Sequence, residues 1–210
     1  MGSNTSNIVP LAEASGRQGR RRARTRAELL RAAKQLFAAR GFHGTKVADI
    51  AAAADAGTGT FYLHFENKDA LFADLVKETA ARAKEEMDLA KAAHSEPRAR
   101  NRAATATFFR FAAANRDVFK ILFGHSAQFN ALLHEVHQLF IADLEEEFAR
   151  GVAEGTFKPF RPALVAQAIV GMLSQLVSWW MEHEDVGIEE ITETTHRLLH
   201  EGSAISKERP

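Results

Sequence analysis

Residues 44–71, GTKVADIAAAADAGTGTFYLHFENKDAL, constrain the fold more than any other part of this chain. Small apolar residues recur there with the three- and four-residue spacing of one helix face, at Val47, Ile50, Ala51 and Ala54. The run Asp55-Ala56-Gly57 then interrupts the helix, because Asp tolerates the left-handed backbone region and Gly enters it freely. A second helix can follow at once, from about Thr58 to Phe65. The sequence therefore predicts two short helices joined by a tight turn.

The second of these helices is expected to turn Phe61 inward and to present hydrogen-bonding, non-acidic groups outward, at Thr58, Thr60, Tyr62 and His64. Thr45 stands at the N-cap position of the first helix. This layout is typical of a helix-turn-helix, in which the second helix lies in the DNA major groove. Two short helices with a turn also occur in many other all-α proteins, so the charge of the neighbouring segment has to be considered.

The segment before the turn is strongly basic. Residues 17–46 contain ten Lys or Arg and a single acid, Glu28, which gives +9 in a chain whose formal net charge is zero. Neutralisation of phosphates by Lys and Arg supplies most non-specific affinity for DNA. A basic run is usually a solvated tail, but this one directly precedes the helix-turn-helix. The pattern therefore favours a DNA-facing N-terminal end and an acidic remainder.

Residues 24–77 resemble the DNA-binding domain of the TetR family of bacterial transcriptional regulators. The matching pieces are LFAARGFHGTKV, DIAAAADAG and GTFYLHFENKDALF, which recur together at the family's spacing. The resemblance implies three N-terminal helices and a long fourth helix that leads into a helical ligand-binding and dimerisation domain. It also implies that the protein leaves its DNA when a ligand binds.

By the same resemblance, Thr60, Tyr62, His64 and Lys68 contact phosphates or line the groove. Thr45 would cap the helix that contains Val47, which is the second helix of the family's domain, and would touch the DNA backbone, with Lys46 beside it. The chain departs from the family's usual residues at four positions, which puts the operator sequence in doubt: Ala48, Asp55, Gly57 and Thr58. The basic arm could add minor-groove contacts, where Arg is favoured, through Arg20, Arg21, Arg22 and Arg24.

The positions of helix-capping and helix-breaking residues predict an all-α chain of about nine helices, with an N-terminal three-helix helix-turn-helix domain and a C-terminal helical domain. We expect residues 1–22 to form a disordered basic arm, residues 23–67 the DNA-binding domain and residues 68–210 the ligand-binding and dimerisation domain. Gly41 should end the N-terminal helix that precedes the helix-turn-helix. The later helices are expected at residues 68–93, 98–114, 116–124, 127–153, 162–184 and 188–201.

Aromatic residues are abundant in the second domain. Several have helical spacings that could converge on an interior, and any one of them could simply pack a core. The family resemblance implies a pocket there, for which the candidate lining residues are Phe108, Phe111, Phe119, Phe123, Met172 and Trp179. Walls of this kind favour a small, largely apolar effector.

The last two helices would form a homodimer interface by family analogy. The helix at residues 162–184 carries an apolar stripe suited to close packing, at Ala163, Ala166, Ile169, Val170, Leu173, Leu176 and Val177. A two-fold dimer has two DNA-binding domains, its two reading heads, each of which contacts one half-site. A palindromic operator is therefore expected, with half-sites about 34–36 Å apart.

Other classes of function find little support. There is no cysteine, and HEVH at residues 134–137 is one residue short of the HExxH zinc pattern, so neither a metal site nor a cofactor is expected. No catalytic pattern, signal peptide or membrane helix is recognised, and we expect a cytoplasmic, non-enzymatic repressor. Two alternatives stay open: a DNA-binding protein of the same fold that acts through a protein partner or as an architectural factor, and a helical lipid-binding protein or enzyme whose basic end meets membrane phosphates.

Overall fold

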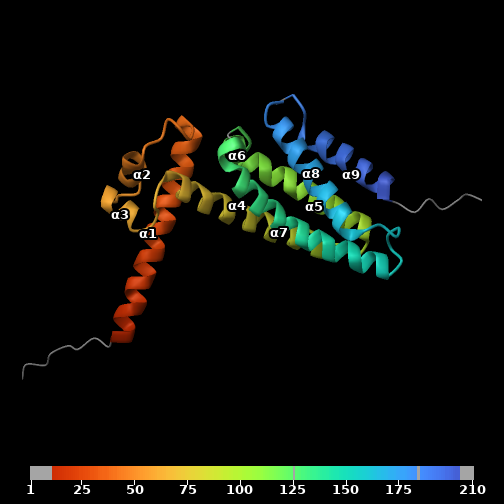
Figure 1. The fold of residues 1–210 in the computed structure, drawn as a ribbon, viewed down its shortest axis with the longest axis horizontal. Helices are drawn as coiled ribbons and strands as arrows, with labels where there is room; N and C mark the ends of the chain where they lie inside the picture. Colours follow the sequence, from red (N-terminus) through yellow and green to blue (C-terminus); the bar gives the residue numbers. More distant parts are fainter. Residues whose placement is uncertain (1–10, 125, 184, 204–210) are drawn as a thin grey trace, which may run out of the picture. The chain divides into compact units, whose positions relative to one another are not determined.

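The computed structural model describes residues 11–124, 126–183 and 185–203, and these are entirely helical and connecting segments, without a strand (Figure 1). The all-α prediction is therefore confirmed, with nine helices in the described residues. The chain divides into two compact units, Met1–Leu75 and Val76–Pro210.

The N-terminal unit contains α1 (Leu11–Arg40), α2 (Val47–Ala53), α3 (Thr58–Tyr62) and the beginning of α4 (Lys68–Ala92). Its core includes three aromatic rings whose centroids lie 5.3 to 5.9 Å apart, those of Phe37, Phe42 and Phe72. Gly41 ends α1 with a φ of +70°, a conformation that glycine adopts without steric cost. Phe42 can thus fold back over the last turn of α1.

Two boundaries differ from the sequence-based expectation. The structure continues α1 back to Leu11, where an irregular arm was expected, and the chain from there to Arg40 has no proline to interrupt a helix. The part of the expected arm at residues 1–10 lies outside the described residues. The units divide after Leu75 and not after residue 67, because Leu71 and Phe72 of α4 are fully buried in the N-terminal unit.

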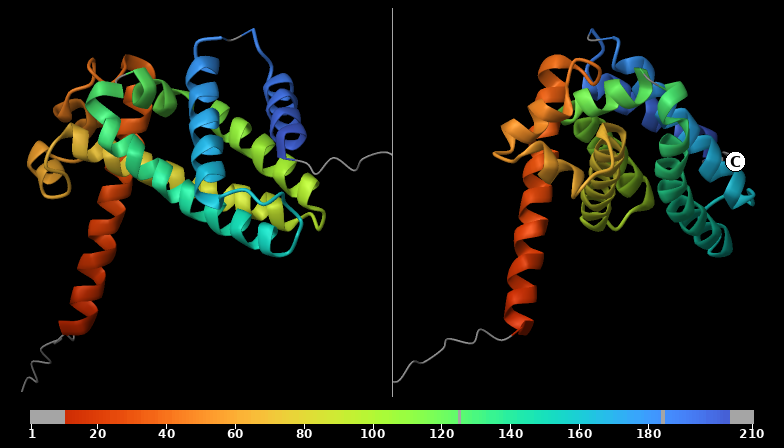
Figure 2. Two further views of the ribbon diagram at one scale, coloured as in Figure 1. Left: turned by 45° about the vertical axis from the view of Figure 1, so that its right-hand side comes forward. Right: turned by 60° about the vertical axis from the view of Figure 1, so that its left-hand side comes forward.

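The C-terminal unit contains the rest of α4 with α5 (Pro97–Ala114), α6 (Arg116–Gly124), α7 (Ser126–Ala153), α8 (Pro162–Trp180) and α9 (Ile188–Ser203). Helix α7 packs against α8, and α5 packs against α9 (Figure 2). Part of the core lies where α5 meets α8 and α9, around Phe109, Val177 and Trp180. Helix α8 ends at Trp180, whereas the sequence predicted a helix to residue 184.

Candidate nucleic-acid interface and effector cavity

The turn between α2 and α3 agrees with the prediction at Asp55, which has a φ of +51°, in the left-handed region that Asp tolerates. Gly57 was also expected to use that region, but its φ is −76°, and it is the N-cap of α3. Phe61 is fully buried, and its ring centroid lies 5.6 Å from that of Phe65. The short helix α3 is therefore anchored by one face, and its other face is exposed.

The exposed face of α3 differs in part from the predicted one. Thr58 and Tyr62 are exposed, as expected, but Thr60 and His64 are only half-exposed. Leu63, which sequence reasoning did not select, is 72% exposed and follows directly on α3. An apolar residue gives no sign by itself that it is exposed, so the sequence offered no signal that would have selected Leu63.

Thr45 does not have the position that the sequence predicted. The N-cap of α2 is Lys46, whose backbone N–H donates to Asp49 Oδ2 at 3.2 Å. Thr45 is buried, and its hydroxyl donates to the carbonyl oxygen of Gly41 at 2.8 Å. The Thr45 hydroxyl thus fastens the loop after α1, while the Lys46 side chain is exposed.

Lys68 connects the start of α4 to the loop between α1 and α2. Its Nζ donates to the carbonyl oxygens of Phe42 at 2.6 Å and Thr45 at 2.9 Å, and lies 4.3 Å from the centre of the Phe42 ring. Burial lowers the pKa of Lys68, against the opposing charge of Asp69. An ammonium group has three donors, so one remains for a further acceptor.

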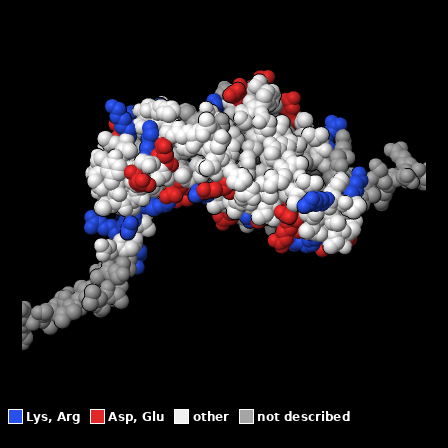
Figure 3. Space-filling model, viewed as in Figure 1, with Lys and Arg blue, Asp and Glu red and all other residues white. Residues whose placement is uncertain are grey.

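Four basic residues of the predicted arm lie on a helix, α1, and are exposed: Arg20, Arg21, Arg22 and Arg24. Figure 3 shows Lys and Arg side chains gathered along this helix. Arg24 pairs with Glu28 at 2.9 Å, and Arg22 donates to the carbonyl oxygen of Leu63 at 3.3 Å. Burial, followed by the charges of Arg22 and Arg26, lowers the pKa of His64. His64 is therefore predominantly neutral at pH 7. Arg20 and Arg21 are exposed without a described ion pair.

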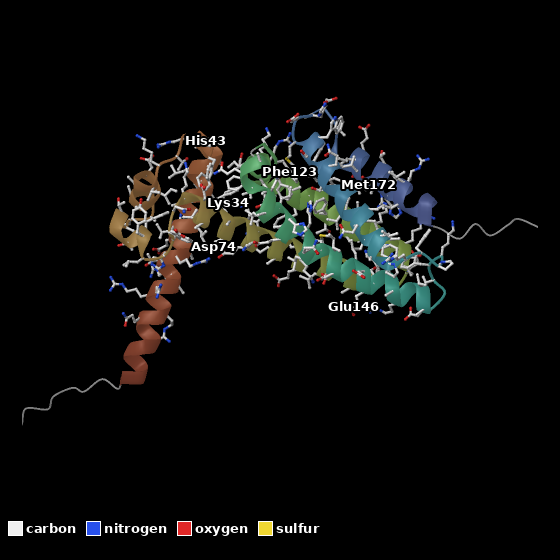
Figure 4. All side chains as sticks on the ribbon, in the orientation of Figure 1. Lys34, His43, Asp74, Phe123, Glu146 and Met172 are labelled. Atoms are coloured by element: carbon white, nitrogen blue, oxygen red, sulfur yellow. The ribbon has the colours of Figure 1, made fainter. Side chains whose placement is uncertain are left out.

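A cavity of about 1360 Å³ lies inside the C-terminal unit, between α4, α5, α6, α7, α8 and α9. Five of the six predicted lining residues surround it: Phe108, Phe111, Phe119, Phe123 and Met172. Figure 4 labels Phe123 on α6 and Met172 on α8. The sixth predicted residue, Trp179, does not line the cavity.

Trp179 is 45% exposed, and its ring stacks on that of His183 with 3.8 Å between the ring centroids. Its neighbour Trp180 is buried and donates Nε1–H to the carbonyl oxygen of Val186 at 2.8 Å.

The mostly apolar wall of this cavity contains one polar pair that joins α7 to α8. His137 Nε2 and Ser174 Oγ share a hydrogen bond of 2.9 Å, and both residues line the cavity. Burial, with a smaller contribution from the charge of His134, lowers the pKa of His137. The uncharged imidazole can exchange its bond to Ser174 for one to a ligand.

The apolar stripe predicted for dimerisation lies largely inside the protomer. Ala166, Val170 and Val177 are buried, and Ile169 and Leu173 line the cavity. A different face of α8 is exposed, formed by Leu164, Gln167, Ala168, Gly171, Gln175 and Trp179. Helix α8 is long and apolar enough to span a membrane by length and composition alone, which is weak evidence for a single helix.

Two family models match this chain. Residues 29–75 match the bacterial regulatory proteins of the TetR family, and residues 94–203 match the tetracycline-repressor-like C-terminal domain. An uncharacterised HTH-type transcriptional regulator, YdgC of Bacillus subtilis, is 29% identical over 156 residues, which cover 72% of this chain and 78% of the relative.

Solved structures give the same fold. The fatty acid degradation regulator FadR of Bacillus halodurans aligns with a TM-score of 0.73 and 24% identity, over 83% of this chain and 93% of that one. A TetR-like regulator of Rhodococcus sp. RHA1 aligns with a TM-score of 0.64 and 26% identity, over 85% and 94%. The chain therefore belongs to the TetR family of bacterial regulatory proteins and is a DNA-binding transcriptional regulator.

Proposed function

We propose that this protein is a homodimeric, one-component repressor that leaves a palindromic operator when a largely apolar molecule occupies the cavity of the C-terminal unit. The observation that carries this proposal is the cavity of about 1360 Å³ with its Phe-rich wall, in a chain that begins with a DNA-binding unit. Its volume exceeds the roughly 300–1000 Å³ of common ligand pockets. A regulator of fatty acid degradation among proteins of this fold is consistent with an apolar effector.

On DNA, exposed α3 would enter the major groove. Thr58 and Tyr62 would face bases and phosphates, and Leu63 would offer an apolar contact to thymine methyl groups. The half-exposed Thr60 and His64 would contribute at the edge of the groove. Phosphates would be held by exposed Lys46, by the remaining donor of Lys68 and by basic residues of α1, among them Arg20, Arg21, Arg22 and Arg24. Thr45 would act indirectly, by fixing the loop that carries Lys46.

The dimer would form through α8 and α9, as family members are dimers. The exposed face of α8 combines Leu164 and Trp179 with the small residues Ala168 and Gly171. A β-carbon added at Gly171 would meet no atom of its own chain within 4 Å, so space beside it is open to a partner helix. Leu164 and Ala168 also line the cavity, so the part of this face that we propose for contact with a second copy is centred on Gln167, Gly171, Gln175 and Trp179.

Release would follow if the ligand binds better to a conformation in which the two reading heads are mis-spaced for DNA. Helix α4 is the lever in this proposal, because one continuous helix begins in the DNA-binding unit and lines the cavity from Val76 to Lys91. No metal or cofactor takes part, and the protein acts where the DNA is, in the bacterial cytoplasm.

The test is selection of bound sequences from random double-stranded DNA with the purified protein, followed by release measurements on the selected site. Enrichment of a palindrome, bound by a dimer and released by apolar compounds, is the expected result. Specific binding that no apolar compound reverses would instead support a regulator that acts through a protein partner. Salt-sensitive binding without a motif would overturn the repressor proposal.

A further inference from the structure

The cavity is elongated along the helices that line it. On α7 the lining residues extend over residues 133–148, and on α4 over residues 76–91. At a rise of about 1.5 Å per residue, each of these stretches is about 22 Å long. Residues 97–111 of α5 line a comparable length. A compact molecule would span only part of this length, whereas an extended alkyl chain could span all of it.

The two ends of the cavity differ in chemistry. Charged lining residues are confined to the C-terminal halves of α4 and α7 and the start of α5: Lys84, Asp88, Lys91, Glu96, Arg98, Asp143 and Glu147. The opposite end is formed by Val118, Phe119, Leu122 and Phe123 of α6 together with Phe108 and Phe111 from the end of α5. Figure 4 labels Phe123 at the apolar end and Glu146, the sequence neighbour of Glu147, on α7.

From this arrangement we infer that the effector is a single-chain lipid with an anionic head, held with its head at Lys91 and Arg98 and its alkyl chain extended toward the phenylalanines of α5 and α6. The inference rests on the proposed effector function of the cavity and specifies the ligand class. A chain buried along the whole apolar wall would contribute binding free energy in proportion to the area removed from water.

The ion-pair distances of the two lining lysines indicate which of them can bind the head group. Lys84 is tightly bound, with Nζ 2.7 Å from Asp143 and 2.9 Å from Asp88. Lys91 has longer contacts, 3.3 Å to Glu147 and 3.5 Å to Asp88, although only 16% of its side chain is exposed. A ligand carboxylate can therefore form a shorter, charge-assisted hydrogen bond to Lys91 than its present partners do.

Arg98 supplies a second cation at the same end. It is exposed yet lines the cavity, so it stands at an opening, and its guanidinium pairs with no acid among the described residues. Glu96, beside it, is already used to cap α5, because its carboxylate accepts the backbone N–H groups of Arg98 and Ala99 at 2.9 and 2.7 Å. The opening is thus more favourable to an anion than the number of acids suggests.

The test is direct binding to the full-length protein without DNA, by calorimetry below the critical micelle concentration. The probes are octanoate, dodecanoate and hexadecanoate, with dodecanol and dodecyltrimethylammonium as neutral and cationic matches to dodecanoate. Affinity should rise with chain length, and dodecanoate should bind tighter than both matched compounds. Equal or tighter binding of the alcohol or the ammonium compound would overturn the anionic head, and affinity independent of chain length would overturn the extended chain.

Two variants locate the head and the chain. Lys91→Met should weaken dodecanoate about tenfold and leave dodecanol unchanged. The control is Lys77→Met, which removes an α4–α7 ion pair to Glu135 outside the cavity lining and should leave both affinities unchanged. Ala104→Leu, in the middle of the α5 wall, should weaken hexadecanoate more than octanoate. A uniform loss for all chains, or a Lys91→Met effect equal to that of Lys77→Met, would contradict the proposed orientation.

Operator binding by the selected DNA is measured separately on the same preparations. If the operator is bound and released by another compound while none of the lipids binds, the lipid inference fails and the repressor function stands. If the lipids bind as expected but no operator is selected, the repressor function fails and the cavity's ligand class stands.

Discussion

The N-terminal unit has a packed aromatic core and a loop held in place by polar side chains, whereas the C-terminal unit contains a large unfilled cavity. In the first, Lys68 and Thr45 bond to backbone carbonyls of one short loop around packed phenylalanine rings. In the second, phenylalanines of α5 and α6 surround a cavity of about 1360 Å³. A DNA-reading surface needs fixed geometry, and an effector site needs space that its own side chains do not occupy. The difference predicts that removing a packed or hydrogen-bonded side chain from the N-terminal unit costs more stability than a substitution in the cavity wall of the C-terminal unit.

The largest effect is expected for Phe61→Ala in the N-terminal unit. The Phe61 side chain is fully buried, so its removal should cost about 3–5 kcal/mol of unfolding free energy and abolish operator binding. Tyr62 is the chain's single tyrosine, and both tryptophans lie in the C-terminal unit, so fluorotyrosine and tryptophan signals report the units separately. In denaturant-induced unfolding of Phe61→Ala, only the transition detected by fluorotyrosine should shift to a lower denaturant concentration. A parallel shift of both signals would contradict independent packing of the two units. Phe61→Leu is the milder control.

Lys68→Ala should lower the unfolding free energy of the N-terminal unit by about 2 kcal/mol, because two charge-assisted hydrogen bonds to backbone carbonyls are lost. If Lys68 also holds a phosphate, the dependence of log affinity on log salt should fall by about one unit. The matched variant is Lys46→Ala, which removes an exposed lysine and should reduce the salt dependence similarly without changing stability. An unchanged slope in Lys68→Ala would restrict its role to holding the loop.

Gly151→Ala tests how tightly the cavity wall is packed in the C-terminal unit. A β-carbon there would meet the Phe157 ring, with Cε2 at 2.5 Å, and that ring stacks on Phe148 at 4.7 Å. Overpacking costs about 1–3 kcal/mol, partly offset by about 1 kcal/mol of helix propensity, so a net loss near 1 kcal/mol is expected. Tryptophan-detected urea unfolding measures it. Gly124→Ala, with no atom within 4 Å, is the control; a loss as large there would rule out the Phe157 contact as the cause.

The smallest effect is a pH dependence in each unit. Burial lowers the folded-state pKa of His64 and of His137 below the ordinary value of 6.5. Below that pH the unfolded chain takes up the proton first, so the stabilising contribution is complete above pH 6.5 and declines as the pH falls. Between pH 7.5 and 5.5, His137→Asn should reduce the loss of stability seen by tryptophan, and His64→Asn the loss seen by fluorotyrosine. If the stability of a variant falls with pH as steeply as that of the unchanged protein, the substituted histidine is not the source of the pH dependence.

Local signals in the sequence predicted the helix-turn-helix well. The α2–α3 turn was expected to place Asp55 in the left-handed region, and Asp55 is found there. The bounds of α6, residues 116–124, were also predicted to the residue. Turn and cap preferences act within a few residues of each other, so they can be read without knowing the tertiary structure.

Which side of a helix faces its own core could not be predicted in the same way. The Trp179-Trp180 pair illustrates this, since the sequence favoured the first for the cavity, but the second is buried and the first is exposed. The predicted apolar stripe of α8 likewise faces inward, and Leu63 faces solvent. On an apolar helix, periodicity defines a stripe but not the neighbour that covers it.

The sequence alone thus determined the all-α class, the reading head with its turn, and the basic charge beside it, because each depends on residues close together along the chain. The tertiary structure alone decided the cavity with its charged and apolar ends, and which face of α8 stays exposed. Both depend on the packing of α4 to α9, whose side chains come together from positions up to about a hundred residues apart, and the free energy of that packing is shared among many weak contacts.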